Sequence, residues 1–312
     1  TEAFTPNRLE LINLLSGQII VAIDNARLYL HLKELNQAYE SFVPKEFLNL
    51  LERKSIIDVK LGDQVQKEMT VMFCDIRGFT TLSEKMTPQE TLAFVNGFLN
   101  IMEPVITQHN GIIDKYIGDA IMALFPLNPD DAVRAAIAMV KKLAAYNKER
   151  EASHLEPIHV GIGLNTGTLV LGTVGDEHRM EGTVISDAVN VASRVESLTK
   201  LYHVSIIITK HTYSKLKHKN FYAIRILDIV TVKGKSKPIT IYEIFDNDPE
   251  ASLILKQKYL PLFEQGVSLF KQKKFAEAFV IFQNIVHDNP YDFSAQFYIE
   301  RCQKKLHLPR IT

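Results

Sequence analysis

The segment "GIIDKYIGDAIMALF", residues 111–125, constrains the fold of this chain more than any other stretch. Two apolar runs flank the turn sequence Tyr-Ile-Gly-Asp, and a glycine tolerates the backbone conformations that a tight turn needs. The pattern therefore predicts a β-hairpin. Asp119 follows the glycine of the turn, while Asp114 and Lys115 lie in the first apolar run. Three charged residues in an otherwise apolar hairpin make this hairpin a candidate functional site.

Composition and charge exclude several classes of protein. The chain has 312 residues, of which 46% are hydrophobic and 23% charged, as in ordinary globular proteins, so disordered and fibrous classes are excluded. Lys+Arg 36 balances Asp+Glu 36, so no overall field attracts nucleic acid or an acidic membrane. The two cysteines, Cys74 and Cys302, fit a reducing cytosol. No apolar run approaches the roughly 20 residues of a membrane span. We expect a cytoplasmic protein that binds no nucleic acid and has no membrane span.

Residues 1–45 carry the pattern of a long helix. Apolar residues recur three and four positions apart in two series, the second after one register shift. The first series is Ile12, Leu15, Ile19, Ala22, Ala26 and Tyr29, and the second is Leu28, Leu32, Leu35, Tyr39 and Phe42. These series predict a coiled coil, and the alternative is one amphipathic helix packed on its own domain. The pattern is already under way at Thr1, so we expect an upstream sensory region.

Beyond Pro44 and a linker over residues 46–67, residues 68–246 change to alternating strand and helix patterns. Such an order predicts an α+β fold in which helices cover a sheet. Strands are predicted at residues 69–74, 158–165, 168–174 and 204–209 and on both sides of "VKGKSKP", residues 232–238, and helices at residues 88–108, 130–149 and 187–198. After Asp248 the pattern is wholly helical.

Two aspartates are placed at the ends of apolar strands. The strand at residues 69–74 runs into "DIRGFT", which places Asp75 at its end, where the backbone amides from Ile76 to Thr80 can turn toward an anion. Asp119 holds the equivalent place in the hairpin. Two carboxylates at strand ends are typical of Mg²⁺ or Mn²⁺ sites that act on phosphates. The alternative is that both aspartates only cap turns.

A third motif, "GTVISDAVNVASRVES" at residues 182–197, predicts a helix that begins after Ser186 or Asp187. Asn190 and Arg194 are four residues apart and so lie on one helix face. An amide and a guanidinium on one face suit a ribose ring and a phosphoryl group, and the alternative is a pair on a solvated surface.

A fourth motif, "VKGKSKP", places Lys233 and Lys235 in a tight loop between two strands. A lysine there can meet a polyphosphate. The alternative is a lysine-rich hairpin that only adds solubility.

Together the motifs "FCDIRGFT", "KYIGDA", "TVISDAVNVASR" and "VKGK" resemble the class III nucleotidyl cyclases, the catalytic domain of adenylate and guanylate cyclases, over about residues 68–246. The resemblance implies a ferredoxin-like sheet covered by helices. It implies that Asp75, Asp119 and the backbone carbonyl of Ile76 hold two Mg²⁺ or Mn²⁺ ions per active site. The residues that it assigns to the substrate are Ile76, Gly78, Phe79 and Thr80 of the first motif, Asn190 for the ribose, Arg194 for the α-phosphate and Lys233 for the terminal phosphates.

The choice of purine depends on two positions. Lys115 matches the family's purine-reading position and can donate a hydrogen bond to adenine N1, whereas guanine carries a proton at N1. Thr183 occupies the partner position, and its hydroxyl can accept from the adenine amino group. The resemblance therefore implies that ATP is converted to 3′,5′-cyclic AMP and pyrophosphate. Asp114 matches no family role and is expected to be structural. Guanylate cyclase activity stays an alternative.

Thr183 also resembles a subgroup formed by cyanobacterial cyclases and the mammalian soluble adenylate cyclase, in which bicarbonate stimulation is reported. A response to bicarbonate is therefore a hypothesis for this chain. The family further implies a head-to-tail homodimer in which each active site takes its metal aspartates from one subunit and its other residues from the second. The alternative from another class is a catalytically silent module that only dimerises.

Both flanks of the cyclase-like region resemble other families. "FTPNRLELINLLSGQIIVAIDNARLY" resembles the last helix of a GAF sensory domain. Residues 252–307 resemble a tetratricopeptide unit through Gly266, Ala278, Phe282 and Pro290, although the first aromatic position of that repeat is not filled. A lone unit cannot bury its own apolar face, so we expect the tail to dock on the catalytic domain or on a partner.

Overall fold

The computed structural model describes residues 5–42, 45–53, 55–176, 179–231 and 238–307, which divide into two compact units. The first unit, Thr1–Leu61, contains α1 (Pro6–Phe42), α2 (Lys45–Leu50) and the short helix η1 (Ile56–Asp58). The second unit, Gly62–Thr312, contains the sheet and all the other helices.

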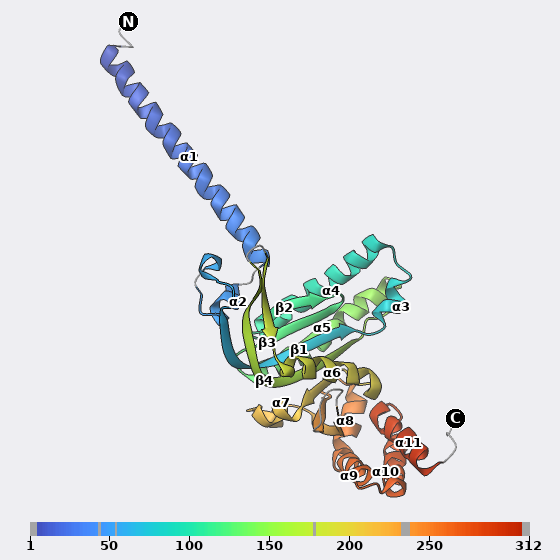
Figure 1. Cartoon of the computed structure of the whole chain (residues 1–312). Coiled ribbons are helices and arrows are strands. Elements are labelled where there is room, and N and C mark those ends of the chain that lie inside the picture. The colour runs from blue at the N-terminus through green and yellow to red at the C-terminus, as the bar shows by residue number, and fades with distance from the viewer. Residues whose placement is uncertain (1–4, 43–44, 54, 177–178, 232–237, 308–312) are drawn as a thin grey trace. The chain divides into compact units, whose positions relative to one another are not determined.

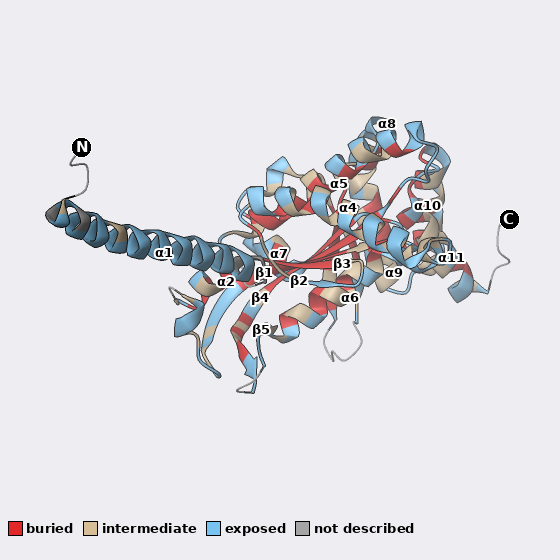
Figure 2. Cartoon of the chain, turned by 90° about the horizontal axis from the view of Figure 1, so that it is seen from above, coloured by how far each residue is buried: buried red, intermediate tan, exposed pale blue. Residues whose placement is uncertain are grey.

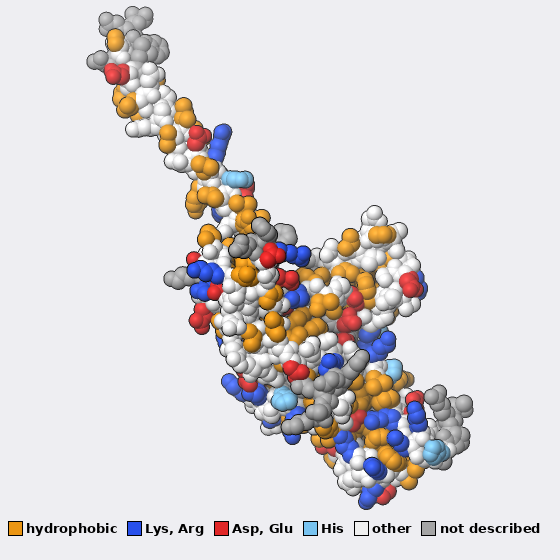
Figure 3. Space-filling model, in the orientation of Figure 1, with side chains coloured by type: hydrophobic (Ala, Val, Ile, Leu, Met, Phe, Trp, Pro, Cys, Tyr) orange, Lys and Arg blue, Asp and Glu red, His pale blue; other side chains and the backbone are white. Residues whose placement is uncertain are grey.

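Helix α1 runs for 37 residues, which confirms the long helix predicted for this region. Large apolar side chains are exposed along it, as Figure 3 shows. They include Leu11, Leu14, Leu15, Ile19, Ile20, Leu28, Leu32 and Leu35. Despite this apolar character, neither α1 nor any other helix in the described ranges has the length and hydrophobicity to cross a membrane.

The second unit is built on an eight-stranded sheet with the strand order β2-β3-β1-β4-β6-β8-β7, and β5 pairs with β4 beside this path. Neighbouring strands are antiparallel except for β4 and β6, which are parallel. The strands are β1 (Gln64–Ile76), β2 (Ile112–Ile117), β3 (Ala120–Phe125), β4 (Val160–Gly175), β5 (Met180–Ile185), β6 (Ile206–Thr209), β7 (Ile224–Val230) and β8 (Ile239–Ile244).

Helices cover both faces of this sheet (Figures 1 and 2). One face carries α4 (Pro88–Gln108) and α5 (Pro129–Ala152), and the other carries α6 (Asp187–Tyr202) and the C-terminal helices. The C-terminal helices are α8 (Glu250–Lys258), α9 (Leu260–Lys271), α10 (Phe275–Asp288) and α11 (Phe293–Leu306). The short helices α3 (Phe79–Ser83), α7 (Lys210–Lys215) and η2 (Lys219–Phe221) lie in the connections.

The sheet is buried on both faces because its central strands alternate between two hydrophobic cores. In β6, Ile206 and Ile208 pack in the core under α4 and α5, while Ile207 packs in the core under α6. Successive side chains of a strand point to opposite faces, so a continuous apolar run indicates a strand covered on both sides. The α+β fold with covered faces that the sequence predicts is confirmed.

The C-terminal helices complete the second core. Their buried residues form one cluster with residues of α6, β6, β7 and β8. Members of that cluster are Val191, Val195, Tyr202, Leu227, Ile241, Phe263, Phe282, Ala295, Tyr298 and Cys302. The tail therefore docks on the α6 face of the sheet, which is one of the two places expected for it.

One predicted break between strands is wrong. Residues 158–165 and 168–174 were predicted as two strands, but β4 runs without a break from Val160 to Gly175. The polar sequence around Thr166 has the composition of a turn. Inside the sheet, however, Thr166 pairs with Thr70 of β1, and their hydroxyl groups are 2.8 Å apart. Because these hydroxyls satisfy each other, the strand continues through the polar segment. The sequence analysis also predicted neither β5 nor α7.

Candidate active site

The two predicted metal ligands meet at one edge of the sheet. Strands β1 and β3 are antiparallel neighbours, and Cys74 pairs with Ile121, so the end of β1 lies beside the start of β3. Asp75 follows Cys74, and Asp119 precedes β3 in a turn where Gly118 has a φ of 64°. The Asp75 carboxyl lies close enough to Asp119 to raise its pKa. The structure thus brings together the two aspartates singled out in the sequence.

The charges of Asp75 and Asp119 favour the binding of a cation between them. Burial first, and the Asp75 carboxylate second, raise the pKa of Asp119 to about 6. Atom Oδ2 of Asp119 is buried and has no hydrogen-bond partner within the described ranges. Two close carboxylates resist ionising together unless a positive charge compensates them.

The donor set suits Mg²⁺ or Mn²⁺. No group of three or more histidine, cysteine or acidic side chains that could hold a metal occurs in the part of the chain that the structure describes. Mg²⁺ commonly binds through one or two carboxylates and completes its shell with water and substrate phosphates. The aspartate pair provides such an incomplete shell.

A third acid, Glu196, belongs to this neighbourhood and was not predicted. It comes from α6 and lies close enough to both aspartates to be influenced by their charges. Burial first, and Asp75 second, raise the pKa of Glu196 to about 7, while the nearby Arg77 opposes this shift. No spacing in the sequence links Glu196 to Asp75, because only the packing of α6 on the sheet brings them together.

Arg77, two residues after Asp75, is also a site neighbour that the sequence analysis missed. Its guanidinium donates hydrogen bonds to the backbone carbonyls of Val160, Thr199 and Val204. It thereby ties the loop after β1 to the C-terminal end of α6.

The rest of the first motif forms the start of α3. Gly78 adopts a left-handed conformation with a φ of 68° immediately before this helix, and Phe79 and Thr80 are its first two residues. Backbone amides in the first turn of a helix have no partner within the helix. The Phe79 ring stacks on Phe94 of α4 with the ring centres 6.2 Å apart. A role of these residues in substrate binding stays a prediction.

The two purine-reading candidates are in contact within one chain. Lys115 of β2 places Nζ 3.4 Å from Oγ1 of Thr183 in β5. The same amine is 3.6 Å from Oδ2 of Asp114 and 3.6 Å from Oε1 of Glu181. A β-bulge between Ile113 and Lys115 redirects the side chains at this point.

Asp114 is buried at this bulge, with only 2% of its side chain exposed, and burial raises its pKa. Its place against the Lys115 amine agrees with the structural role expected for it. Glu181 was not predicted, because the sequence analysis identified no strand there.

Helix α6 carries Asn190 and Arg194, the residues predicted to contact the ribose and the α-phosphate. Its N-cap is Ser186, whose hydroxyl accepts from the amide of Ala188 at 3.0 Å, as the sequence indicated. Asn190 is exposed and Arg194 is half-buried. Within the described residues Arg194 forms no ion pair, so the structure brings it to no carboxylate of its own chain.

The backbone of α6 lies very close to β4. A Cβ atom added at Gly163 would lie 2.2 Å from the amide nitrogen of Glu196, so the glycine permits this approach. This contact sets how closely α6 approaches the sheet near Glu196.

The predicted phosphate-binding lysine, Lys233, lies outside the described residues, and so does Lys235. The strands predicted on both sides of them are present as β7 and β8.

Known proteins of one family are similar to this chain in sequence. Residues 61–245 match the family model of the adenylate and guanylate cyclase catalytic domain. An adenylate cyclase of Dictyostelium discoideum, described as terminal-differentiation specific, is 40% identical over 276 residues, which are 86% of this chain and 13% of that protein. An adenylate cyclase of Anabaena cylindrica is 45% identical over 219 residues, or 68% of this chain and 44% of that protein. The chain therefore spans less than half the length of each of these relatives.

Solved structures agree as well. The adenylyl cyclase CyaB from P. aeruginosa superposes with a TM-score of 0.53 at 34% identity and covers 60% of this chain and 98% of that one. The guanylyl cyclase Cya2 superposes with a TM-score of 0.51 at 32% identity and covers 61% of this chain and 98% of that one. On its family match and its fold, the chain belongs to the class III adenylate and guanylate cyclase catalytic domain family.

Proposed function

We propose that this chain is an adenylate cyclase that converts ATP to 3′,5′-cyclic AMP and pyrophosphate. The observation that carries the proposal is the contact of Lys115 with Thr183, at 3.4 Å, in a chain that also pairs Asp75 with Asp119. The first contact offers a donor and an acceptor to one edge of a purine, and the second offers carboxylates to metal ions on a polyphosphate. Both curated relatives described above are named adenylate cyclases.

The two residues proposed to face the purine favour ATP over GTP. The Lys115 ammonium can only donate, and adenine N1 accepts, whereas N1 of guanine carries a proton. The Thr183 hydroxyl can accept from the adenine amino group. A site built to hydrogen-bond one base leaves buried groups unpaired when the other base binds.

The chain's own residues would each take one part in the reaction. Asp75, Asp119 and the carbonyl of Ile76 would hold the metal ions, and Asn190 would orient the ribose so that its 3′-oxygen faces the α-phosphorus. Bound Mg²⁺ or Mn²⁺ would lower the pKa of the 3′-hydroxyl and neutralise charge on the polyphosphate. Arg194 would stabilise the negative charge that grows on the α-phosphate, and Lys233 would bind the terminal phosphates.

The active unit in this proposal is a head-to-tail homodimer with two shared sites. Within the described residues Arg194 of α6 forms no ion pair with Asp75, Asp119 or any other carboxylate. A second copy can supply what each half lacks. The apolar residues exposed on α1 support a coiled coil between the two copies.

The remaining assignments complete the proposal. Residues 1–45 would be the end of a GAF-like helix and a coiled coil, residues 46–67 a signal-transducing linker, residues 68–246 the catalytic domain and residues 252–307 a tetratricopeptide-like tail. The close packing of Gly266 against Phe282 supports a paired-helix repeat, because a Cβ atom at Gly266 would lie 2.8 Å from that ring. A sensory region upstream and a cytoplasmic location fit this arrangement.

A single assay tests the reaction. The chain is incubated with ATP or with GTP in the presence of Mn²⁺, and the cyclic nucleotide is measured. We expect cyclic AMP from ATP and little cyclic GMP from GTP. Cyclic GMP alone would establish the guanylate cyclase alternative, and neither product would point to a silent dimerising module.

Mixed dimers test the shared sites. Asp119→Ala and Arg194→Ala should each be inactive as homodimers, because every site then lacks one part. After subunit exchange, half of the dimers are mixed and each mixed dimer keeps one intact site, so activity should recover to about a quarter of wild type. Two affinity tags would isolate the mixed dimer. A mixed dimer as inactive as its parents would contradict the shared-site arrangement.

A further inference from the structure

The C-terminal end of α6 is held by residues that lie far from it in the sequence. Tyr202, the last residue of α6, is 1% exposed, and its hydroxyl donates to Oδ2 of Asp228 in β7 at 2.6 Å. Arg301 of α11 donates to the same oxygen at 2.6 Å. The hydroxyl of Ser294, also in α11, donates to the backbone carbonyl of Tyr202 at 3.1 Å. We call Tyr202, Asp228, Ser294 and Arg301 the α6 anchor.

Aromatic packing surrounds the α6 anchor. The Tyr202 ring meets Phe297 of α11 edge to face, with the ring centres 5.1 Å apart. The Arg301 guanidinium lies over the rings of Phe270 and Tyr298 at 4.5 and 4.8 Å. Because Asp228 is 1% exposed, its carboxylate needs the charge of Arg301 and the Tyr202 hydroxyl to be stable there. The C-terminal helices thus contact the end of α6 through hydrogen bonds as well as through apolar packing.

The metal-binding edge of the sheet holds the same end of α6 from another direction. Arg77 donates to the carbonyl oxygens of Thr199, in the last turn of α6, and of Val204 just beyond it. A positive group at a helix C-terminus also interacts favourably with the helix dipole. The catalytic candidates Asn190 and Arg194 lie further toward the N-terminus of this helix, so their position depends on how its far end is fixed.

We propose that the C-terminal helices position the catalytic face of α6, and that Tyr202 is a positioning residue that acts through Arg194. The proposal rests on the proposed cyclase function. Helix α6 has 16 residues and is nearly rigid, and Arg194 lies eight residues, or about 12 Å, before Tyr202, so a small tilt or shift at Tyr202 displaces Arg194 as well. A displacement of about 1 Å at reacting groups can lower a rate about 100-fold, and a fraction of this displacement has a measurable effect.

The test variant is Tyr202→Phe, which removes one hydroxyl and keeps the ring. We expect kcat to fall about 3- to 10-fold, a fraction of the effect of a full 1 Å displacement. KM for ATP should stay within about twofold, because Lys115 and Thr183 lie on β2 and β5 rather than on α6. The matched control is Ile285→Val, which removes one methylene from the same core but lies in α10 and belongs to no part of the α6 anchor. It should lower the melting temperature and leave kcat unchanged.

A double-mutant cycle shows through which residue Tyr202 acts. In an Arg194→Lys background, which keeps a positive charge and a measurable rate, adding Tyr202→Phe should lower the residual kcat by less than it does in wild type, since the guanidinium that it positions is absent. A full additional 3- to 10-fold loss in that background would overturn the route through Arg194. Equal kcat for Tyr202→Phe and wild type, or equal losses for Tyr202→Phe and Ile285→Val, would overturn the positioning role.

Hydrogen exchange separates this proposal from the cyclase assignment. The amides of α6 should exchange faster in Tyr202→Phe than in wild type, and Ile285→Val should leave them unchanged. A wild-type chain that makes no cyclic nucleotide would refute the proposed function. If the wild-type chain makes no cyclic nucleotide, hydrogen exchange still tests the role of the α6 anchor. Amides of α6 that exchange at the wild-type rate in Tyr202→Phe would refute that role, and faster exchange would support it.

Discussion

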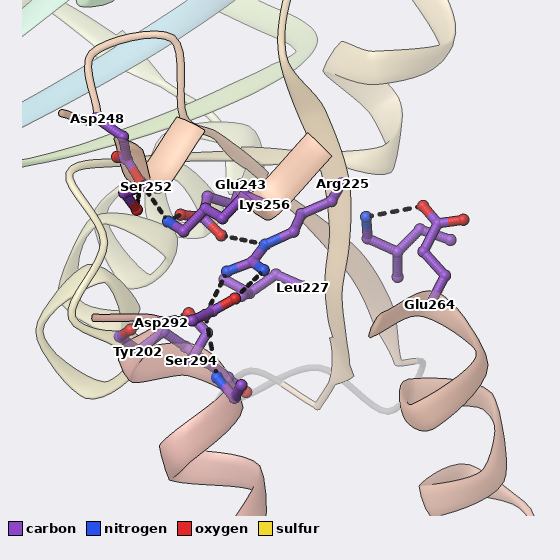
Figure 4. A network of polar contacts seen from close by, with 12 residues as sticks. Tyr202, Arg225, Leu227, Glu243, Asp248, Ser252, Lys256, Glu264, Asp292 and Ser294 are labelled. Carbon is purple, nitrogen blue, oxygen red and sulfur yellow. Dashed lines mark hydrogen bonds and ion pairs between the residues drawn. The ribbon is translucent and has the colours of Figure 1, made fainter. Parts of the chain in front are cut away.

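Two clusters of charged residues in the second unit differ in burial and in charge: one is partly buried and acidic, and the other is fully buried and carries both signs of charge. The acidic cluster, Asp75, Asp119 and Glu196, gathers three carboxylates at the edge of the sheet where β1 ends. The mixed-charge network, Arg225, Glu243, Lys256 and Asp292, joins β7 and β8 to the C-terminal helices (Figure 4). In the network every charge faces an opposite one. Arg225 lies 2.6 Å from both Glu243 and Asp292, and Lys256 lies 2.6 Å from Glu243.

The pKa shifts follow this difference. In the acidic cluster, burial and like charges raise the pKa of Asp119 to about 6 and that of Glu196 to about 7. Burial alone would also raise the pKa of Asp292, but Arg225 and Lys256 hold it below its usual range. Buried charge is therefore no sign of a functional site by itself. Close charges of one sign with raised pKa values are typical of a functional site, whereas buried charges that are paired are typical of a structural network.

The largest difference between the clusters should appear on removal of one charge from the acidic cluster. Asp75→Ala removes a proposed metal ligand but no core volume, so turnover should fall about 1,000-fold or more, the equivalent of several kcal/mol of lost charge stabilisation. The melting temperature of the metal-free protein should not fall, because one repulsive charge is gone. The cyclic AMP rate and a thermal melt measure the two effects. Near-normal turnover of ATP would contradict the metal assignment.

Removal of one charge from the mixed-charge network should mainly lower the stability of the fold. Arg225→Met leaves Glu243 and Asp292 buried without their shared partner, which should destabilise the fold by about 3–5 kcal/mol in urea unfolding. Lys274→Met is a suitable control, because the ion pair of Lys274 with Glu277 is about half exposed. Its loss should lower the free energy of unfolding by less than about 1 kcal/mol. Similar unfolding free energies for the two variants would show that the network is not a structural element.

The smallest effect should be the dependence of stability on pH. Asp119 and Glu196 have raised pKa values, so the folded state holds more protons than the unfolded state between about pH 4 and pH 7. The metal-free protein should therefore lose stability as the pH rises through this window, by a few degrees in melting temperature. Asp292 has a lowered pKa, so its contribution is complete at neutral pH and is lost only in acid.

Thermal melts in a chelator at pH 5.5 and pH 8 would measure this effect. Glu196→Gln removes one of the two titrating groups and should flatten the dependence, and saturating Mg²⁺ should reduce it too. A metal-free melting temperature that stays constant or rises between these pH values would contradict the charge repulsion in the acidic cluster.

The sequence predicted the parts of this molecule that local patterns encode. The hairpin around Gly118 was predicted from two apolar runs and a turn, and a strand was predicted at "VSIIIT". The capping residue Ser186 and the spacing of Asn190 and Arg194 placed α6 correctly. The family resemblance alone assigned Lys115 and Thr183 to the reading of the purine, and their contact was not predicted, because no local pattern joins residues so far apart in the chain.

The parts that escaped prediction depend on long-range packing. Glu196 reaches the aspartates only because glycines on β4 let α6 approach the sheet. Arg225 pairs with Asp292 across a hydrophobic core that neither segment indicates by itself. The break predicted within β4 was wrong because a polar stretch resembles a turn until the hydroxyls of Thr70 and Thr166 are seen to satisfy each other.

The C-terminal helices that complete the second core also affect the order in which the chain can fold during synthesis. Ile207 leaves the ribosome long before Tyr298 and Cys302, which cover the same face of the sheet. At about 5–20 residues per second, the roughly 100 residues between them take on the order of ten seconds to appear. During that time the apolar side chains of α6 and of the strands beneath it are exposed, because the C-terminal helices that bury them have not yet been made. Chaperones bind to such exposed apolar surfaces, and nascent chains can aggregate through them. The second core therefore cannot be completed before α11 has been synthesised.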